Sequence, residues 1–245
     1  MTEIPSDVTV CITSCGRLDL LQETLSSFRK FNTGGRIILH EDSCDEDVLT
    51  KARELFPDIQ IIHGDTRRGL MGSIDALYSE VETAYIFHLE DDWAFEGPVN
   101  WQAAIQLLSE NPQVSNVCVR KFAEIKPKWA ERSTELTAAD TSFRHMKSDA
   151  HAEFFGWSTN PGLISKELYS EFAPFGRVLH DQMSRTIKGA GKTMAFLLPG
   201  VASHIGDGRY VTDPTMGPRP KTKLGKLKRS IFKKLYYMGW RSSPF

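Results

Sequence analysis

Apolar runs and amphipathic segments alternate along the first half of the chain. Short runs rich in β-branched and other apolar residues predict strands at 8–13, 36–40, 59–63 and 85–89. Apolar residues at three- and four-residue spacing predict helices at 18–28, 48–55 and 73–82. Strands joined by helices form right-handed crossovers, and ligands gather at the carboxyl ends of such strands. This half predicts an α/β fold with a mainly parallel sheet flanked by helices.

The pattern becomes less regular after residue 93. Helices are predicted at 100–109, 166–172 and 181–188, and strands at 114–119, 153–158 and 193–198. Residues 121–150 are polar and charged with weak periodicity, which is typical of a variable loop. The predicted architecture is one domain with a mixed, mainly parallel sheet.

Composition and charge divide the chain into two parts. Its 245 residues suffice for one large α/β domain, and its four cysteines are dispersed, which indicates a reduced, cytoplasmic compartment and no zinc site. No run of roughly 20 apolar residues predicts a membrane span, and no signal-peptide pattern opens the chain. Residues 219–245 contain nine Lys and Arg and no acids, so residues 1–218 carry 21 basic against 31 acidic side chains, a charge of −10. We predict a domain over 1–218 and a basic tail over 219–245.

Three consecutive carboxylates follow the strand at 85–89. A polar turn explains one or two acids there, but Glu90, Asp91 and Asp92 repel one another unless a cation offsets their charge. Alternation along an extended segment would place Glu90 and Asp92 on one face and Asp91 on the other. The cluster predicts a site for a divalent metal or a phosphate at the carboxyl edge of the sheet.

The order of these segments resembles a GT-A glycosyltransferase of the family 2 type over about residues 8–208. The resemblance rests on the opening strand and helix at 8–31, on Glu41-Asp42-Ser43 after the second strand, on the basic loop Arg67-Arg68-Gly69, and on Glu90-Asp91-Asp92 as the DxD motif. The chain departs from the family pattern in carrying Glu90 as the first acid of that motif. His180-Asp181-Gln182 stands where many members have a Glu-Asp pair.

The resemblance implies a donor-binding set of residues. Asp92 would bind Mn²⁺ or Mg²⁺ directly, with Glu90 acting through water or the donor ribose, and Asp91 belongs to the same donor-binding motif. Arginines suit phosphate oxygens, which makes Arg17, Arg67 and Arg68 diphosphate ligands, with solvated loop arginines as the alternative. Thr13 and Asp42 would hold the base and ribose, although short polar residues at strand ends also form ordinary turns.

Three later residues complete the predicted site. Asp181 is the predicted catalytic base, and its alternative role is that of a helix N-cap. His204 would complete the metal shell before the flexible segment 206–208, or be structural. Trp157 would stack on a sugar of the donor or acceptor, or lie in the core.

These residues predict a metal-dependent, inverting transferase that moves a sugar from a nucleotide-sugar donor, a UDP-sugar, to a saccharide or lipid-linked acceptor in surface polysaccharide or glycolipid synthesis. A nucleotidyltransferase and a non-catalytic nucleotide-sugar or glycan-binding module are the alternatives. The tail carries apolar residues at helical spacing among lysines, which fits a helix on an anionic membrane surface at the inner face of the membrane, or one docked on the domain. Nucleic-acid binding is not predicted, because no fold for it accompanies the basic residues.

Overall fold

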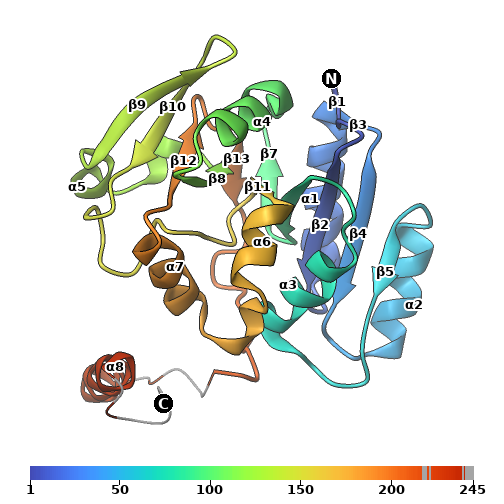
Figure 1. Cartoon of the computed structure of the whole chain (residues 1–245). Helices are drawn as coiled ribbons and strands as arrows, with labels where there is room; N and C mark the ends of the chain where they lie inside the picture. Colours follow the sequence, from blue (N-terminus) through green and yellow to red (C-terminus); the bar gives the residue numbers. More distant parts are fainter. Residues whose placement is uncertain (217–219, 221, 239, 241–245) are drawn as a thin grey trace. The chain divides into compact units, whose positions relative to one another are not determined.

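A computed structural model describes residues 1–216, 220, 222–238 and 240 (Figure 1). The chain divides into two compact units, Met1–Arg209 and Tyr210–Phe245. The first unit contains the sheets and the helices that cover them, and the second contains helix α8 (Lys223–Tyr237). The boundary predicted after residue 218 therefore falls inside the second unit.

A mixed sheet forms the centre of the first unit. Within the described residues it has nine strands in the order β5-β4-β2-β6-β11-β8-β12-β10-β9. In chain order these strands are β2 (Val8–Ser14), β4 (Arg36–Glu41), β5 (Gln60–Ile62), β6 (Tyr85–Glu90), β8 (Val114–Cys118), β9 (Ser133–Ala138), β10 (Thr141–Met146), β11 (Gly162–Ser165) and β12 (Thr193–Leu197). Two small sheets pair β1 (Thr2–Glu3) with β3 (Asn32–Thr33), and β7 (Trp93–Phe95) with β13 (Ala202–His204).

Parallel pairing is concentrated in the amino-terminal part of the sheet. Strands β5, β4, β2 and β6 are all parallel to their neighbours in this group. Strand β11 then pairs antiparallel with both β6 and β8, and β10 pairs antiparallel with β12 and β9. The mixed sheet is confirmed. Because β2, β4 and β6 run in the same direction, their carboxyl ends share one edge.

Helices cover both faces of this sheet (Figure 1). They are α1 (Leu18–Phe31), α2 (Glu46–Leu55), α3 (Gly69–Ser79), α4 (Trp101–Glu110), α5 (Pro127–Ala130), α6 (Lys166–Phe172) and α7 (His180–Gly189), with 3₁₀ turns η1 (Phe122–Glu124) and η2 (Phe175–Arg177). Side-chain alternation explains the two faces. In β6, Phe87 and Leu89 join the core under α1 and α4, whereas Ile86 joins the core under α3, α6 and α7.

Local sequence sets where several helices begin. Asp45 accepts the backbone N–H groups of Asp47 and Val48 at 2.9 and 3.3 Å and so caps α2. Asn100 and Ser165 cap α4 and α6 in the same way, at 3.2 and 3.1 Å. Each cap satisfies donors that a helix leaves without partners at its first turn.

Two predicted segments differ in the structure. The predicted loop 121–150 contains the β9–β10 hairpin, whose turn residues Ala139 and Asp140 have φ of 43° and 55°. Two positive φ values match a tight hairpin turn, but Ala-Asp lacks the glycine or asparagine that usually marks one. The predicted strand at 153–158 is wrong, because Phe155 has a φ of 71° and the backbone there turns.

Gly156 fixes how this turn packs on α7. A Cβ added there would lie 1.8 Å from the carbonyl oxygen of Ser184, while the Ser184 hydroxyl accepts the N–H groups of Gly156 and Trp157 at 3.0 and 3.3 Å. The turn and the helix are therefore in backbone contact.

We expect Gly156→Ala to lower the free energy of unfolding by about 3 kcal/mol or more, because backbone atoms cannot yield as a flexible side chain does. Urea titration measures the change. Gly189→Ala at the end of the same helix meets nothing within 4 Å and should be neutral or stabilising. Equal effects of the two substitutions would contradict the packing.

Candidate active site

The parallel strands β2, β4 and β6 end side by side. Residues Thr13 and Glu90 are partners in the β2–β6 register, and the N–H of Asp42 donates to the carbonyl of Ser14 at 2.9 Å. The predicted donor-binding residues Thr13, Asp42 and Glu90 are thus gathered at one edge of the sheet. Thr13 and Asp42 are both buried.

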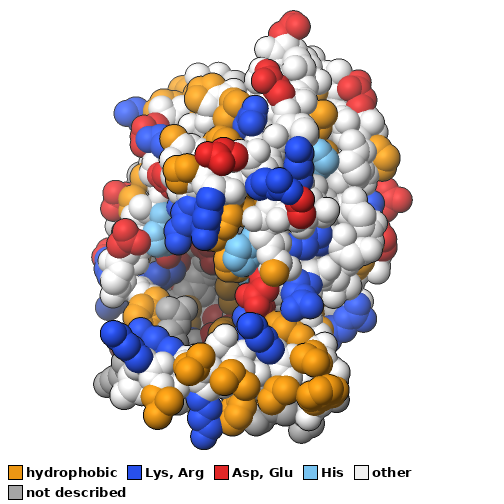
Figure 2. All heavy atoms as spheres, turned by 90° about the vertical axis from the view of Figure 1, so that its left-hand side faces the viewer, with side chains coloured by type: hydrophobic (Ala, Val, Ile, Leu, Met, Phe, Trp, Pro, Cys, Tyr) orange, Lys and Arg blue, Asp and Glu red, His pale blue; other side chains and the backbone are white. Residues whose placement is uncertain are grey.

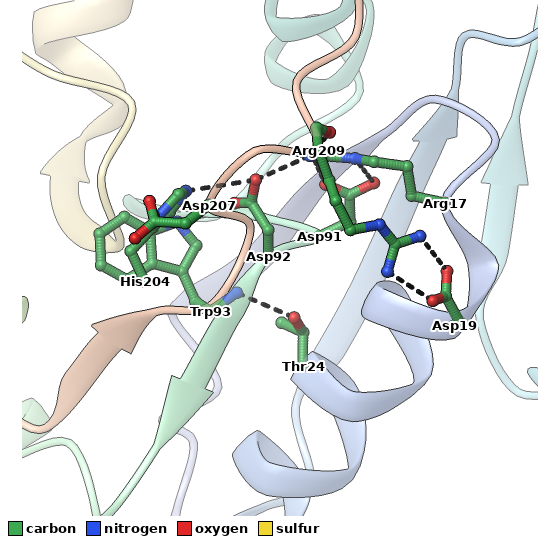
Figure 3. A network of polar contacts seen from close by, with 9 residues as sticks. All are labelled: Arg17, Asp19, Thr24, Asp91, Asp92, Trp93, His204, Asp207 and Arg209. Atoms are coloured by element: carbon green, nitrogen blue, oxygen red, sulfur yellow. Dashed lines mark hydrogen bonds and ion pairs between the residues drawn. The ribbon is translucent and has the colours of Figure 1, made fainter.

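Arg17 contacts both aspartates of the acid cluster from one side (Figure 3). Its guanidinium contacts both carboxylate oxygens of Asp91 and lies 2.9 Å from Oδ2 of Asp92. Asp91 is 1% exposed. The prediction that Asp91 and Asp92 point to opposite faces is wrong, because β6 ends at Glu90 and the chain turns before β7.

His204 lies beside Asp92, as Figure 3 shows. Strands β7 and β13 pair so that His204 is opposite Trp93, and Nε2 of His204 is 3.4 Å from Oδ2 of Asp92. The other ring nitrogen is 3.3 Å from a carboxylate oxygen of Asp207. Among the described residues, Oδ1 of Asp92 is buried and has no hydrogen-bond partner. An unpartnered buried carboxylate oxygen is costly, so this atom is suited to a ligand that supplies positive charge.

The segment after β13 is tied over the acids by its main chain. Ile205 N–H donates to the carbonyl of Asp92 at 2.9 Å, and Arg17 donates to the carbonyl of Arg209 at 2.9 Å. The Arg209 guanidinium pairs with both oxygens of Asp19 at the start of α1, at 2.6 and 2.9 Å. Sequence reasoning missed Asp19 and Arg209, which lie 190 residues apart and have no common motif.

Asp42 holds the start of α3. Its carboxylate accepts the N–H groups of Arg68 and Gly69 at 2.6 and 2.9 Å, and Nε of Arg67 is 3.9 Å from Oδ2. The neighbouring Glu41 accepts the N–H groups of Gly16 and Ser43 at 2.8 and 2.9 Å. The second acid motif therefore shapes two loops of the site, a role that the sequence did not reveal.

Burial and mutual repulsion shift the protonation of the acid cluster. Burial, followed by the charges of Asp92 and Asp91, raises the pKa of Glu90 from 4.5 to about 8. Burial also raises the pKa of Asp91 from 3.8 to about 6, against the opposing effect of Arg17. Of these two acids, Glu90 is the one whose raised pKa favours the neutral form at pH 7.

Asp181 begins α7 but does not cap it. The N-cap is Leu179, and Asp181 is a buried residue of the first turn, so the cap alternative does not apply. Burial, followed by the charge of His180, lowers the pKa of His88 in β6 to about 3.

Trp157 belongs to the core. Its ring is 1% exposed and packs against Phe175 and His180, with centroids 4.9 and 5.4 Å apart. A ring buried in this way has no face to offer a sugar, so the structure contradicts the stacking role and supports the core alternative.

Among the described residues, the side chains near Asp92 supply only part of the ligands that a metal ion needs. In the described part of the chain, no group of three or more His, Cys, Asp or Glu side chains is arranged to hold a metal ion. Asp92 offers its unpartnered Oδ1 as an oxygen ligand, and His204 beside it offers a ring nitrogen. These donors suit Mn²⁺ or Mg²⁺ only if further oxygens come from a bound substrate or water.

The chain belongs to glycosyl transferase family 2, whose profile matches residues 9–169. This confirms the family that the motifs indicate. Comparison with curated protein sequences gives no match.

Solved structures confirm the GT-A fold. GalNAc-T7 with UDP, GalNAc and Mn²⁺ is 13% identical, with a TM-score of 0.57 over 95% of this chain and 49% of that chain. A mannosyltransferase from Pyrobaculum calidifontis in complex with GDP-Man and Mn²⁺ is 14% identical, with a TM-score of 0.60 over 83% and 58%. TarS residues 1–349 from S. aureus is 10% identical, with a TM-score of 0.54 over 81% and 60%. The chain thus spans about half to three-fifths of these structures.

The raised pKa of Glu90 predicts a stability that falls as pH rises. Between about pH 4.5 and 8 the folded protein retains the Glu90 proton, whereas the unfolded chain has lost it. The stability that this proton contributes is therefore fully present below pH 4.5 and is lost as the pH rises through 8. We expect Glu90→Gln to flatten the loss of unfolding free energy between about pH 6 and 8, measured with a chelator present. The exposed Glu82→Gln is the control. Parallel curves for wild type and Glu90→Gln would contradict the shift.

Proposed function

We propose that the chain transfers a sugar from a nucleotide-sugar donor, with the donor diphosphate bound at Asp92 and His204 through Mn²⁺ or Mg²⁺. The observation that carries this is the buried, unpartnered Oδ1 of Asp92 beside His204, at the end of β6 in a family 2 fold. Distant GT-A structures were solved with Mn²⁺ and a nucleotide or nucleotide sugar, which supports the same ligands here.

The bound cation would act as a Lewis acid that stabilises the negative charge left on the diphosphate. Arg17 neutralises Asp91 and orients Asp92, because it contacts both carboxylates. Arg67 and Arg68 precede α3 at the same edge of the sheet and would bind donor phosphate oxygens. Thr13 and Asp42 would contact the base and ribose, with Asp42 oriented by the two N–H groups that it accepts.

Asp181 would remove the proton of the attacking acceptor hydroxyl. The new bond then forms on the face of the sugar opposite the departing diphosphate, which inverts the anomeric carbon. Asp181 is a buried carboxylate in the first turn of α7.

The donor that we propose is a UDP-sugar, and the acceptor a saccharide or a lipid-linked sugar in surface polysaccharide or glycolipid synthesis. One observation favours a non-catalytic binding module instead. Arg17 offsets part of the charge of Asp91 and Asp92, so this cluster can persist with no metal bound, and metal-dependent cleavage of a donor would then not occur.

Donor cleavage with and without Mn²⁺ tests the proposal. We expect nucleoside diphosphate release from at least one member of a nucleotide-sugar panel, and its loss with a chelator. Asp92→Asn and His204→Gln should each lower Mn²⁺ affinity by roughly 100-fold or more. Asp140→Asn, at an exposed residue of the β9–β10 turn, is the control. Metal-independent nucleotide binding without turnover on any donor would support the binding module.

Replacing Asp181 separates catalysis from donor binding. We expect Asp181→Asn to lower kcat about 10²- to 10⁴-fold while the Kd for the donor stays unchanged, since a general base acts only on the acceptor hydroxyl. Glu167→Gln removes an exposed acid from the first turn of α6 and controls for a helix-dipole effect. A kcat near that of the wild type would exclude Asp181 as the base.

A further inference from the structure

Helix α8 presents a single apolar stripe. Its residues recur at steps of three, four, four and three, which keeps them on one face: Leu224, Leu227, Ile231, Leu235 and Met238. No residue of α8 is buried, and Leu224 and Leu227 are 76% and 58% exposed. Figure 2 shows these hydrophobic side chains gathered along the helix at the bottom of the view. Thr222 caps the helix through the N–H of Gly225 at 3.1 Å.

Lysines border this stripe on both sides. At 100° per residue, Lys228 and Lys234 lie about 60° to either side of the centre of the stripe. Lys226 and Lys233 lie about 140–160° away, on the opposite face. Residues 219–245 contain nine basic and no acidic residues. A partner that covers the apolar stripe would therefore meet positive charge along the whole length of α8.

We propose that α8 lies in the plane of an anionic lipid surface, with its apolar stripe at the boundary of headgroups and acyl chains. Long lysine side chains beside such a stripe reach lipid phosphates while their methylene stems stay in apolar surroundings. Trp240, beyond the end of the helix, is 72% exposed, which suits the aromatic preference for the membrane interface.

Two alternative roles of this helix explain less. Among the described residues, no helix is both long and hydrophobic enough to cross a bilayer. Packing of α8 on the chain's own acidic residues would satisfy the lysines, but it gives no reason for lysines on both borders of an apolar stripe. A lipid surface accounts for the stripe, its lysine borders and the exposed Trp240 together.

Flotation of the full chain with lipid vesicles tests this proposal and requires neither donor nor turnover, so it stands apart from the proposed function. We expect the protein to float with vesicles containing about one-third phosphatidylglycerol in phosphatidylcholine, and to be released at high salt. Much less of the protein should float with vesicles of pure phosphatidylcholine than with the anionic vesicles. Equal partition into both vesicles, or into neither, overturns the proposal.

Matched variants test the orientation of the helix. Ile231→Asn in the stripe should weaken binding by about tenfold or more, the ratio expected from burying one such side chain. Its neighbour Ser230→Asn lies outside the stripe and should bind normally. Equal losses from these two variants would overturn the proposal.

Charge variants test which lysines meet the lipid. Lys228→Gln with Lys234→Gln should weaken binding about fivefold per lysine. Lys226→Gln with Lys233→Gln should weaken it less, because the far face lies about a Debye length from the surface. A larger loss from the Lys226 and Lys233 pair would overturn the orientation. If the full chain does not float and Ile231→Asn lowers the Tm of the protein, α8 packs on protein instead, and the proposal fails.

Discussion

The contact of Arg17 with Asp91 and Asp92 is the constraint on which the site depends. Two adjacent carboxylates at the end of a buried strand repel each other, and Asp91 is almost fully enclosed. A guanidinium can pair with both because its donors form a fixed planar fork. The same group also donates to the carbonyl of Arg209, so one side chain joins the β2–α1 turn, the end of β6 and the segment after β13.

The sheet and the late segments of the chain make different contributions. Strands β2, β4 and β6 supply acids at one edge because parallel strands end together. Strand β13 then brings His204 to Asp92, and the pair Asp19–Arg209 ties the following segment to α1. The site at the end of β6 is therefore assembled from segments that are distant in sequence, the first strands of the sheet and the segment from β13 to Arg209.

Much of the first half could be predicted from sequence, because apolar periodicity reports burial directly. The strands β2, β4, β5 and β6 and the helices α1 to α4 follow it, whereas the short strands β3 and β7 were not predicted. The residues gathered at the sheet edge were predicted as well. The β9–β10 hairpin was missed because Ala139-Asp140 lacks the residues that favour positive φ. The partners of Arg17 and Arg209 depend on tertiary contacts, and neither the burial of Trp157 nor the true N-cap of α7 has a local pattern that would reveal it.

The pairing of β7 with β13 fixes the distance between Asp92 and His204. His204 is opposite Trp93, one residue after Asp92, so main-chain hydrogen bonds and not side-chain packing set the spacing between the carboxylate and the imidazole. Repacking of the surrounding side chains would leave that spacing nearly unchanged. A single residue inserted between Gly200 and Ser203 would instead turn His204 to the other face of its strand. The imidazole would then no longer lie beside Asp92, although no side chain of the site had been replaced.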